Sequence, residues 1–108
     1  MSASLKHLSA FQRDILYLAA DLETPYGLGI KRALDEYYGE EVNRGRVYQN
    51  LSKLVDEGYL DKSAIDKRTN SYTLTSEALR AMEGRHRWQH SRANRQIQLE
   101  DLRTSLWH

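Results

Sequence analysis

The change of hydrophobic period along the chain is the feature that most constrains the fold. Up to Gly58 the apolar residues recur at the three- and four-residue spacing of amphipathic helices. Between residues 59 and 75 aromatic and β-branched residues partly alternate with polar ones, as in short strands. The helical spacing then returns. This order predicts three short helices, a two-stranded hairpin and one long helix, a mainly α fold with a small β component.

The first two helices have clear boundaries. Ser9 followed by Gln12 forms a capping-box pattern before the first apolar run, and the sequence "TPYG" at residues 24–27 ends that helix. A second, shorter helix is predicted over residues 28–38 and ends at Gly39. The residues expected to face the core are Phe11, Ile15, Leu18, Ala19, Leu22, Ile30, Leu34 and one of Tyr37 and Tyr38.

The third helix is predicted to start after Asn43 as N-cap and to end near Glu57, with Gly58 beyond it. Residues 59–63 and 70–75 then form the hairpin, and Thr75 can cap the last helix, which could run to about Thr104. The expected buried residues here are Val47, Leu51, Leu54, Val55, Tyr59, Tyr72, Leu79 and Met82.

Three helices followed by a hairpin are typical of a winged helix-turn-helix. In that architecture the third helix enters the DNA major groove and the hairpin is the wing. We therefore expect residues 1–75 to form a winged helix-turn-helix DNA-binding domain. Residues 76–108 would form a C-terminal dimerisation helix, and the whole chain would be one compact domain.

The third helix carries positive charge at its N-terminal end, where the helix macrodipole already disfavours cations. Arg46, Gln49 and Lys53 follow at i, i+3 and i+7, on the face opposite the apolar stripe. Arginine, glutamine and lysine are the side chains that read guanine, adenine and phosphate. A negative partner such as DNA would explain this placement. The alternative is an ordinary solvated helix face.

The hairpin tip carries a second set of donors at Lys67, Arg68, Thr69 and Asn70, suited to phosphate or minor-groove contacts. A charged hairpin tip can also serve solubility alone. Two basic elements in the winged-helix order favour DNA. The predicted DNA-binding residues are Asn43, Arg44, Arg46, Tyr48, Gln49, Asn50, Lys53, Lys67, Arg68, Thr69 and Asn70.

At these residues the chain resembles the PadR-like winged-helix transcriptional regulators, including haloarchaeal members and phage-repressor relatives. The recognition helix of that family has a pattern like G-x-L-Y-P-x-L-x-x-L-x-x-x-G. "YGLGI" at residues 26–30 and "DKRTNSYTLT" at residues 66–75 are similar to its second helix and its wing. The resemblance spans about residues 8–82. The matching recognition-helix positions are Gly45, Val47, Tyr48, Leu51, Leu54 and Gly58.

The resemblance implies a dimeric DNA-binding regulator paired through its C-terminal helix, and within the group the chain resembles a regulator of oxidative-stress genes. Gln49 replaces the family proline, so base reading by Gln49 is inferred from its chemistry and not from the family.

The last helix is too long to bury one face against so small a domain, which favours a symmetric contact with a second copy. Trp107 belongs either to that contact or to a frayed end. Arg85, Arg87, Arg92 and Arg95 form either a solvated face or a supplementary anion contact. The residues predicted for dimerisation are Met82, Trp88, Ile97, Leu102 and Leu106.

Composition excludes several other functions. The 108 residues include no cysteine, which excludes disulfides and thiol chemistry and fits a cytoplasmic protein. The sequence lacks a membrane span, a Gly-rich phosphate loop and a catalytic constellation, so neither an enzyme nor a cofactor or small-molecule ligand is expected. His86 and His90 could hold a metal at i, i+4, although solvated or interface histidines are the simpler interpretation. The rival function is a protein–protein adaptor whose basic face binds an acidic partner.

Overall fold

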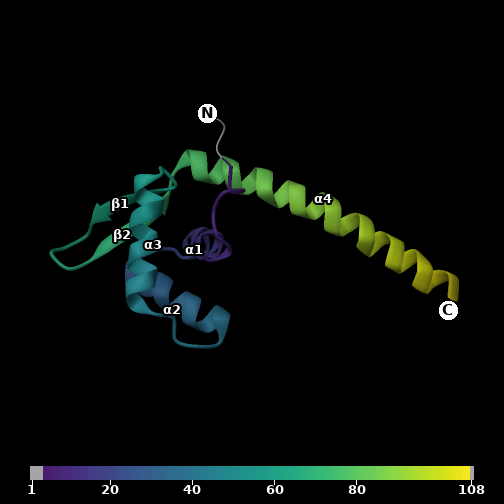
Figure 1. Cartoon of the computed structure of the whole chain (residues 1–108), viewed down its shortest axis with the longest axis horizontal. Helices are drawn as coiled ribbons and strands as arrows, with labels where there is room; N and C mark the ends of the chain where they lie inside the picture. The colour runs from purple at the N-terminus through teal and green to yellow at the C-terminus, as the bar shows by residue number, and fades with distance from the viewer. Residues whose placement is uncertain (1–3, 108) are drawn as a thin grey trace.

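The computed structural model describes residues 4–107, with side chains through residue 104, and it confirms the predicted fold class and order of elements. Figure 1 shows three short helices and a two-stranded wing gathered at one end of the molecule, with a long helix leading away from them. The elements are α1 (Ala10–Asp21), α2 (Gly27–Tyr38), α3 (Arg44–Asp56), β1 (Leu60–Ala64), β2 (Asn70–Leu74) and α4 (Ser76–Trp107).

The helix ends follow the predicted capping chemistry. Ser9 and Gln12 form both bonds of the capping box at α1, and the Asn43 side chain accepts the backbone N–H of Arg46 at α3. Gly39 and Gly58 have φ of 70° and 85°, a left-handed backbone that glycine adopts without strain. The start of the recognition helix is therefore fixed by its own sequence.

One core joins the three short helices, since each contributes fully buried aliphatic side chains. Leu16 also belongs to it, although the helical spacing did not select that residue. The segment before α1 adds Leu5 and Leu8, and the Tyr59 hydroxyl donates to the Ser4 carbonyl at 2.7 Å. The core residues of the three helices are Phe11, Ile15, Leu16, Ala19, Ile30, Leu34, Val47, Leu51 and Leu54.

The two tyrosines at the end of α2 differ in their surroundings. Tyr38 is half covered and its ring stacks on Phe11, with 6.0 Å between centroids, whereas Tyr37 is 65% exposed. Tyr38 is thus the one that meets α1. Its hydroxyl also donates to the Asp14 carboxylate, which joins α2 to α1 a second time.

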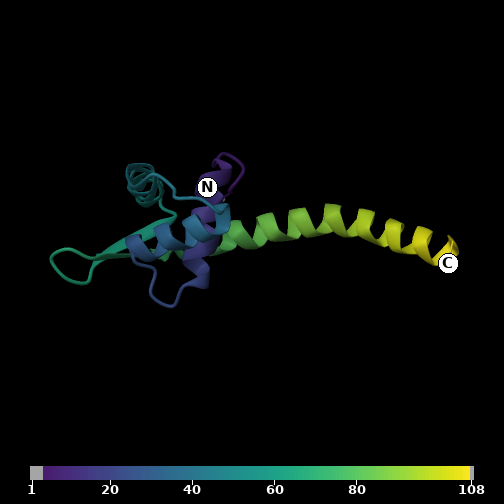
Figure 2. The ribbon, with the colours of Figure 1, turned by 90° about the horizontal axis from the view of Figure 1, so that it is seen from below.

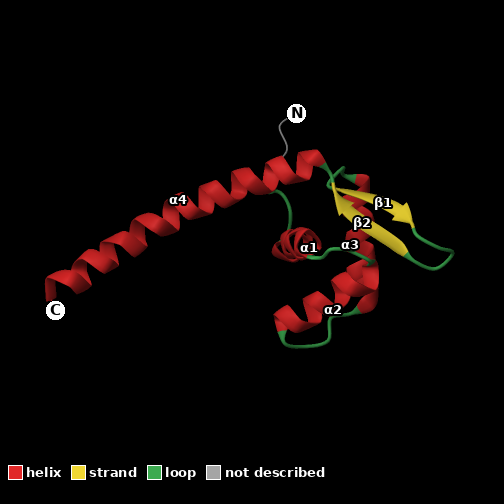
Figure 3. Cartoon of the chain, turned by 180° about the vertical axis from the view of Figure 1, so that it is seen from behind, coloured by secondary structure: helices red, strands yellow, loops and turns green. Residues whose placement is uncertain are grey.

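The wing is an antiparallel hairpin whose register runs from Leu60 opposite Leu74 to Ala64 opposite Asn70. The chain before α2 adds a third segment, because Tyr26 bridges Ser71 and the backbone N–H of Tyr72 donates to the Pro25 carbonyl at 2.8 Å. Figure 3 shows the hairpin beside α3 with its tip projecting from the domain. The wing is thereby attached to the start of α2.

The long helix begins inside the domain and ends far outside it. Thr75 caps it, as predicted, by accepting the N–H of Ala78 at 3.1 Å. Ala78, Ala81 and Met82 are buried, whereas Leu79 is 52% exposed, so the prediction of Leu79 as a core residue was wrong. At about 100° per residue Leu79 lies roughly 100° from Ala78 and 160° from Ala81, so it falls at the edge of the buried side of α4.

Met82 also differs from its predicted role as a dimer contact. It lies in the core of its own chain, which leaves it little surface for a partner. Beyond it, α4 extends away from the domain in both views, and the molecule measures 62 × 36 × 23 Å (Figures 1 and 2). None of the helices within residues 4–107 combines the length and apolar character that a bilayer crossing requires.

Candidate nucleic-acid interface

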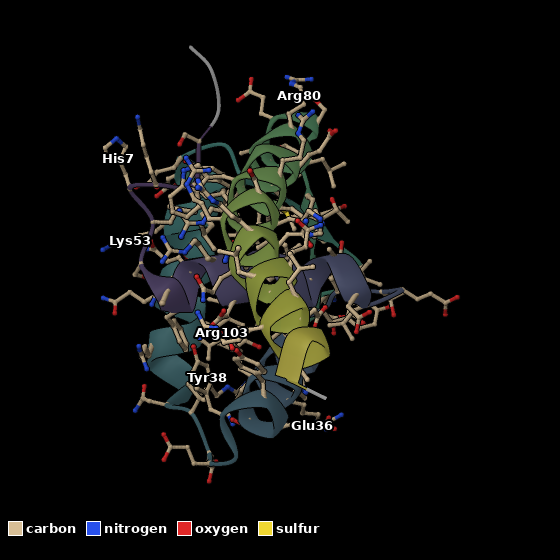
Figure 4. All side chains as sticks on the ribbon, turned by 90° about the vertical axis from the view of Figure 1, so that its right-hand side faces the viewer. His7, Glu36, Tyr38, Lys53, Arg80 and Arg103 are labelled. Atoms are coloured by element: carbon tan, nitrogen blue, oxygen red, sulfur yellow. The ribbon has the colours of Figure 1, made fainter. Side chains whose placement is uncertain are left out.

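The recognition helix α3 has one buried stripe and three other sides. Val47, Leu51 and Leu54 are fully buried against the core. Directly opposite, Gln49 and Lys53 are exposed, as predicted for the outward face, and Figure 4 shows Lys53 pointing away from the domain. The two flanks between these sides contact different elements, one the wing and the other α1.

The flank toward the wing carries Arg44 and Tyr48. The guanidinium of Arg44 lies 5.7 Å from the centroid of the Tyr48 ring. That ring packs on the first residue of α2, because a Cβ added to Gly27 would lie 2.7 Å from Tyr48 Cε1. A larger residue at this position would require the end of the Tyr48 side chain to move. Gly27 thus brings α2 close enough for Tyr48 to stand between α2 and the wing.

A cavity of about 150 Å³ lies between the starts of α2 and α3 and the part of the wing where its tip loop joins β2. It collects five residues predicted for DNA binding, which lie far apart in the sequence, and none of its lining side chains is acidic. Neither of its two guanidinium groups forms an ion pair within residues 4–104. Such a cavity is suited to an anion. The lining residues are Tyr26, Gly27, Leu28, Arg44, Tyr48, Arg68, Thr69, Asn70 and Tyr72.

The flank toward α1 carries Arg46 and Asn50. The guanidinium of Arg46 lies 3.7 Å from the centroid of the Phe11 ring. Asn50 accepts from Gln12 Nε2 at 3.0 Å through Oδ1, and its Nδ2 donates to the Arg46 carbonyl at 2.8 Å. Both polar ends of Asn50 are therefore occupied within the chain, and its side chain links α1 to α3.

The turn between α2 and α3 is held by charged groups. Lys31 donates to Asp35 at 2.8 Å, and Asp35 accepts the backbone N–H of Val42 at 2.7 Å. The hydrogen bond from Lys31 is the main cause that lowers the pKa of Asp35, followed by the one from Val42. A charged Asp35 thus fixes the segment that leads into the N-cap Asn43.

The tip of the wing is shaped by Asp66, whose carboxylate accepts the backbone N–H of Arg68 at 2.8 Å. This bond is the main cause that lowers the pKa of Asp66. Arg68 lines the cavity, whereas Lys67 lies exposed at the tip and outside it. The wing therefore offers one cation beside the recognition helix and one farther out.

The predicted dimer residues lie along the exposed part of α4. Trp88, Ile97 and Leu102 are 49%, 57% and 61% exposed. At about 100° per residue, Leu99 and Leu102 fall within about 40° of Trp88, but Ile97 falls on the opposite side. One apolar stripe thus holds Trp88, Leu99 and Leu102 without Ile97. The side chain of Leu106 lies outside the described residues.

Trp88 itself is flanked by cations, since Arg85 and Arg92 lie 4.9 and 4.4 Å from its ring centroid. The rings of His86 and His90 stack with 6.1 Å between centroids. Within the described residues no group of three or more histidine, aspartate and glutamate side chains is arranged to hold a metal.

Sequence reasoning missed three residues of this interface: Phe11, Gln12 and Tyr26. Phe11 and Gln12 were assigned to the core and to a helix cap, and both also contact side chains of α3. Tyr26 was part of a motif without a role. A helical wheel of α3 alone carries no signal for neighbours on other helices.

Comparison with known proteins agrees with this geometry. The family model of the transcriptional regulator PadR-like family matches residues 15–83. Halobacterium salinarum RosR, from crystals grown from NaBr, is 46% identical with a TM-score of 0.79, over 92% of this chain and 93% of that one. The RosR-S4 complex is 45% identical with a TM-score of 0.81, over 94% and 90%.

A MarR protein from Peptoclostridium difficile shares the fold alone, with 22% identity and a TM-score of 0.61 over 85% of this chain and 55% of that one. The comparison with curated proteins found no match. The family match covers more than half of the chain, and the RosR structures align over nearly all of it. The chain therefore belongs to the PadR-like family of transcriptional regulators, and its winged helix is a DNA-binding fold.

Proposed function

We propose that this regulator binds double-stranded DNA as a homodimer on a pseudo-palindromic operator, in the cytoplasm, and controls stress-response genes. The α3 helix enters the major groove and the wing follows the adjacent backbone. The choice of stress-response genes rests on the resemblance of the sequence alone. The family function is regulatory and not enzymatic.

The observation that carries the proposal is the cavity shared by α3 and the wing. Arg44 and Tyr48 enter it from the recognition helix, and Arg68, Thr69 and Asn70 enter it from the hairpin. The positive end of the α3 dipole adds to the charge of the two guanidinium groups. A DNA phosphate supplies the missing negative charge, and one bound there would set the depth of α3 in the groove.

The remaining contacts divide by position on α3. Arg46 and Gln49 lie in the N-terminal half of the helix, which in helix-turn-helix proteins meets base edges. Lys53 lies one turn beyond Gln49 and would meet a phosphate as the helix leaves the groove. Asn43, as N-cap, would approach the backbone. Lys67, at the wing tip, would reach the backbone or minor groove farthest from α3.

Pairing through α4 explains why so much apolar surface lies outside the core. The stripe of Trp88, Leu99 and Leu102 is exposed in the single chain, and a second copy would cover it symmetrically. Two α3 helices related by a two-fold axis would then enter the major groove one helical turn apart, roughly 34–36 Å, or a multiple of it. This geometry requires a pseudo-palindromic site.

Binding to duplex DNA as a function of salt tests the proposal against the adaptor alternative. We expect the full chain to enrich one palindromic sequence from a pool of random duplexes. The logarithm of its binding constant should fall linearly with the logarithm of the salt concentration, with a slope of about −0.9 per phosphate contacted. Enrichment of no sequence, together with binding to an acidic protein that needs Arg44 and Arg68, would favour the adaptor instead.

A further inference from the structure

We infer that Phe11 of α1 is a positioning residue for base recognition, because its ring holds the Arg46 guanidinium in place before DNA arrives. The inference rests on the proposed function, in which Arg46 reads a base edge. It extends the specificity-determining part of the protein from α3 to a helix that enters no groove.

The contact between Arg46 and Phe11 is close. A separation of 3.7 Å between the guanidinium carbon and the ring centroid equals the distance at which carbon atoms touch. Two planar groups reach this separation when they lie face to face. The guanidinium therefore covers one face of the ring, and an arginine on the surface is held on a residue that is itself buried.

Phe11 is a rigid support because other groups fix its ring. It is a core residue, and Tyr38 stacks on it with an interplanar angle of 27°. Tyr38 is held in turn by its hydrogen bond to Asp14. Burial, helped by this bond, raises the pKa of Tyr38 to about 12, so the phenol keeps the proton it donates at neutral pH. The ring under Arg46 thus has a fixed position in the folded chain.

The backbone of Arg46 is held by the same helix. Gln12 accepts the N–H of Ser9 through Oε1 and donates to Asn50 through Nε2. Asn50 then donates to the carbonyl of Arg46. The N-cap of α1 is therefore connected by three hydrogen bonds to the residue that we propose as the base reader.

This arrangement leaves Arg46 able to read a base. A stacked contact uses the face of the guanidinium, while its five N–H donors point outward in the plane, toward bidentate acceptors such as guanine O6 and N7. Within residues 4–104 these donors have no hydrogen-bond or ion-pair partner. The stacked Arg46 side chain loses part of its conformational entropy when the chain folds. Less of that entropy is then lost when Arg46 binds the matching base.

Substitutions of Phe11 test the inference on the full chain, with the duplex enriched from random DNA and its single-base-pair variants. Phe11→Leu keeps an apolar side chain and removes the aromatic face. It should lower discrimination at the base pair that depends on Arg46 by about two- to five-fold, the size of an exposed cation–π contact. Affinity for random DNA should stay unchanged. Phe11→Tyr keeps the face and should keep the discrimination.

Combining each change with Arg46→Ala separates positioning from a general loss of stability. Without Arg46, Phe11→Leu should cause no further change at that base pair. An equal loss with and without Arg46, or an equal weakening on all DNA, would overturn the inference. If Phe11→Leu melts at the assay temperature, Phe11→Met fills the site instead. If Arg46→Ala alone leaves every base preference intact, base reading by Arg46, and not only its support by Phe11, is wrong.

Discussion

Helices α3 and α4 use their surfaces in opposite ways. In α3 one side is buried in the core, one flank faces the wing and the other flank contacts α1, so that only Gln49 and its neighbours face away from the domain. In α4 the packing against the domain ends near Arg85, and beyond it Trp88, Leu99 and Leu102 are 48–61% exposed.

The difference separates the part of the proposed DNA interface that one chain positions by its own contacts from the part that needs a second chain. The position of α3 is set by contacts that exist in one copy, including the Gly27–Tyr48 approach and the Gln12–Asn50 bond. Within the described residues the distal half of α4 is exposed along nearly all of its length. On the proposed function, base reading by one α3 is therefore a property of the single chain, and the spacing between two recognition helices is a property of the pair.

Breaking the α4 stripe should have the largest effect. We expect Leu99→Glu with Leu102→Glu to yield a monomer, because two charges cannot be buried unpaired at a symmetric contact. Specific affinity should then fall by roughly 10²–10⁴-fold, since the second half-site no longer binds intramolecularly. Light scattering measures the mass and a binding titration the affinity.

Ile97→Glu is the matched control, on the opposite side of the same helix. It should leave both the dimer and the affinity intact. A monomer from Ile97→Glu but not from the double variant would place the contact on the other face of α4.

The two cations of α3 that we propose as DNA contacts, Arg46 on the flank toward α1 and Lys53 on the outward side, should give the next largest effect. Arg46→Ala should cost roughly 1–3 kcal/mol on the preferred duplex and relax the preference at one base pair. Lys53→Ala should weaken binding to all duplexes alike and flatten the salt slope by about one unit. Titrations on specific and random duplexes at several salt concentrations measure both. An equal loss on both duplexes for Arg46→Ala would make Arg46 a phosphate contact.

The wing should matter less than the helix. Arg68→Ala removes one of the two cations of the cavity, whereas Lys67→Ala removes a charge at the tip. We expect each to flatten the salt slope by about one unit. Only Lys67→Ala should also shorten the footprint, because it acts farthest from α3. An unchanged footprint and affinity in both variants would remove the wing from the interface.

The sequence predicted most of the fold because its signals are local. Ser9 with Gln12, Asn43, Gly39 and Gly58 act within four residues of the boundaries they define, and the buried stripe of α3 follows from period alone. The errors came where a position depends on a distant neighbour. Leu79 was expected in the core, but the buried side of α4 holds Ala78, Ala81 and Met82 instead.

The sequence predicted which residues belong to the candidate site, but it did not predict how they are arranged in space. A wheel of α3 separates Val47 from Gln49 and places Arg44 and Arg46 about 160° apart, yet it does not show which element each flank meets. Their environments differ because Tyr48 lies under one and Phe11 under the other, and the position of those rings depends on how α1 and α2 cross α3. The same applies to Asn50, which the sequence placed among DNA contacts while Gln12, 38 residues earlier, binds its side chain.

The neighbours Gln49 and Asn50 give the finest test, because one faces outward and the other faces α1. Asn50→Ala removes the bonds to Gln12 and to the Arg46 carbonyl, and should lower the free energy of unfolding by about 0.5–1.5 kcal/mol. Gln49→Ala should change stability by less than about 0.5 kcal/mol, since the side chain is exposed. Urea denaturation measures both. On DNA the pattern should reverse, with Gln49→Ala altering the preference at its own base pair and Asn50→Ala altering none beyond the pair that Arg46 reads. If Asn50→Ala shifts the preference at any other base pair and leaves stability unchanged, Asn50 turns from α1 toward the groove when DNA binds, as the sequence alone predicted.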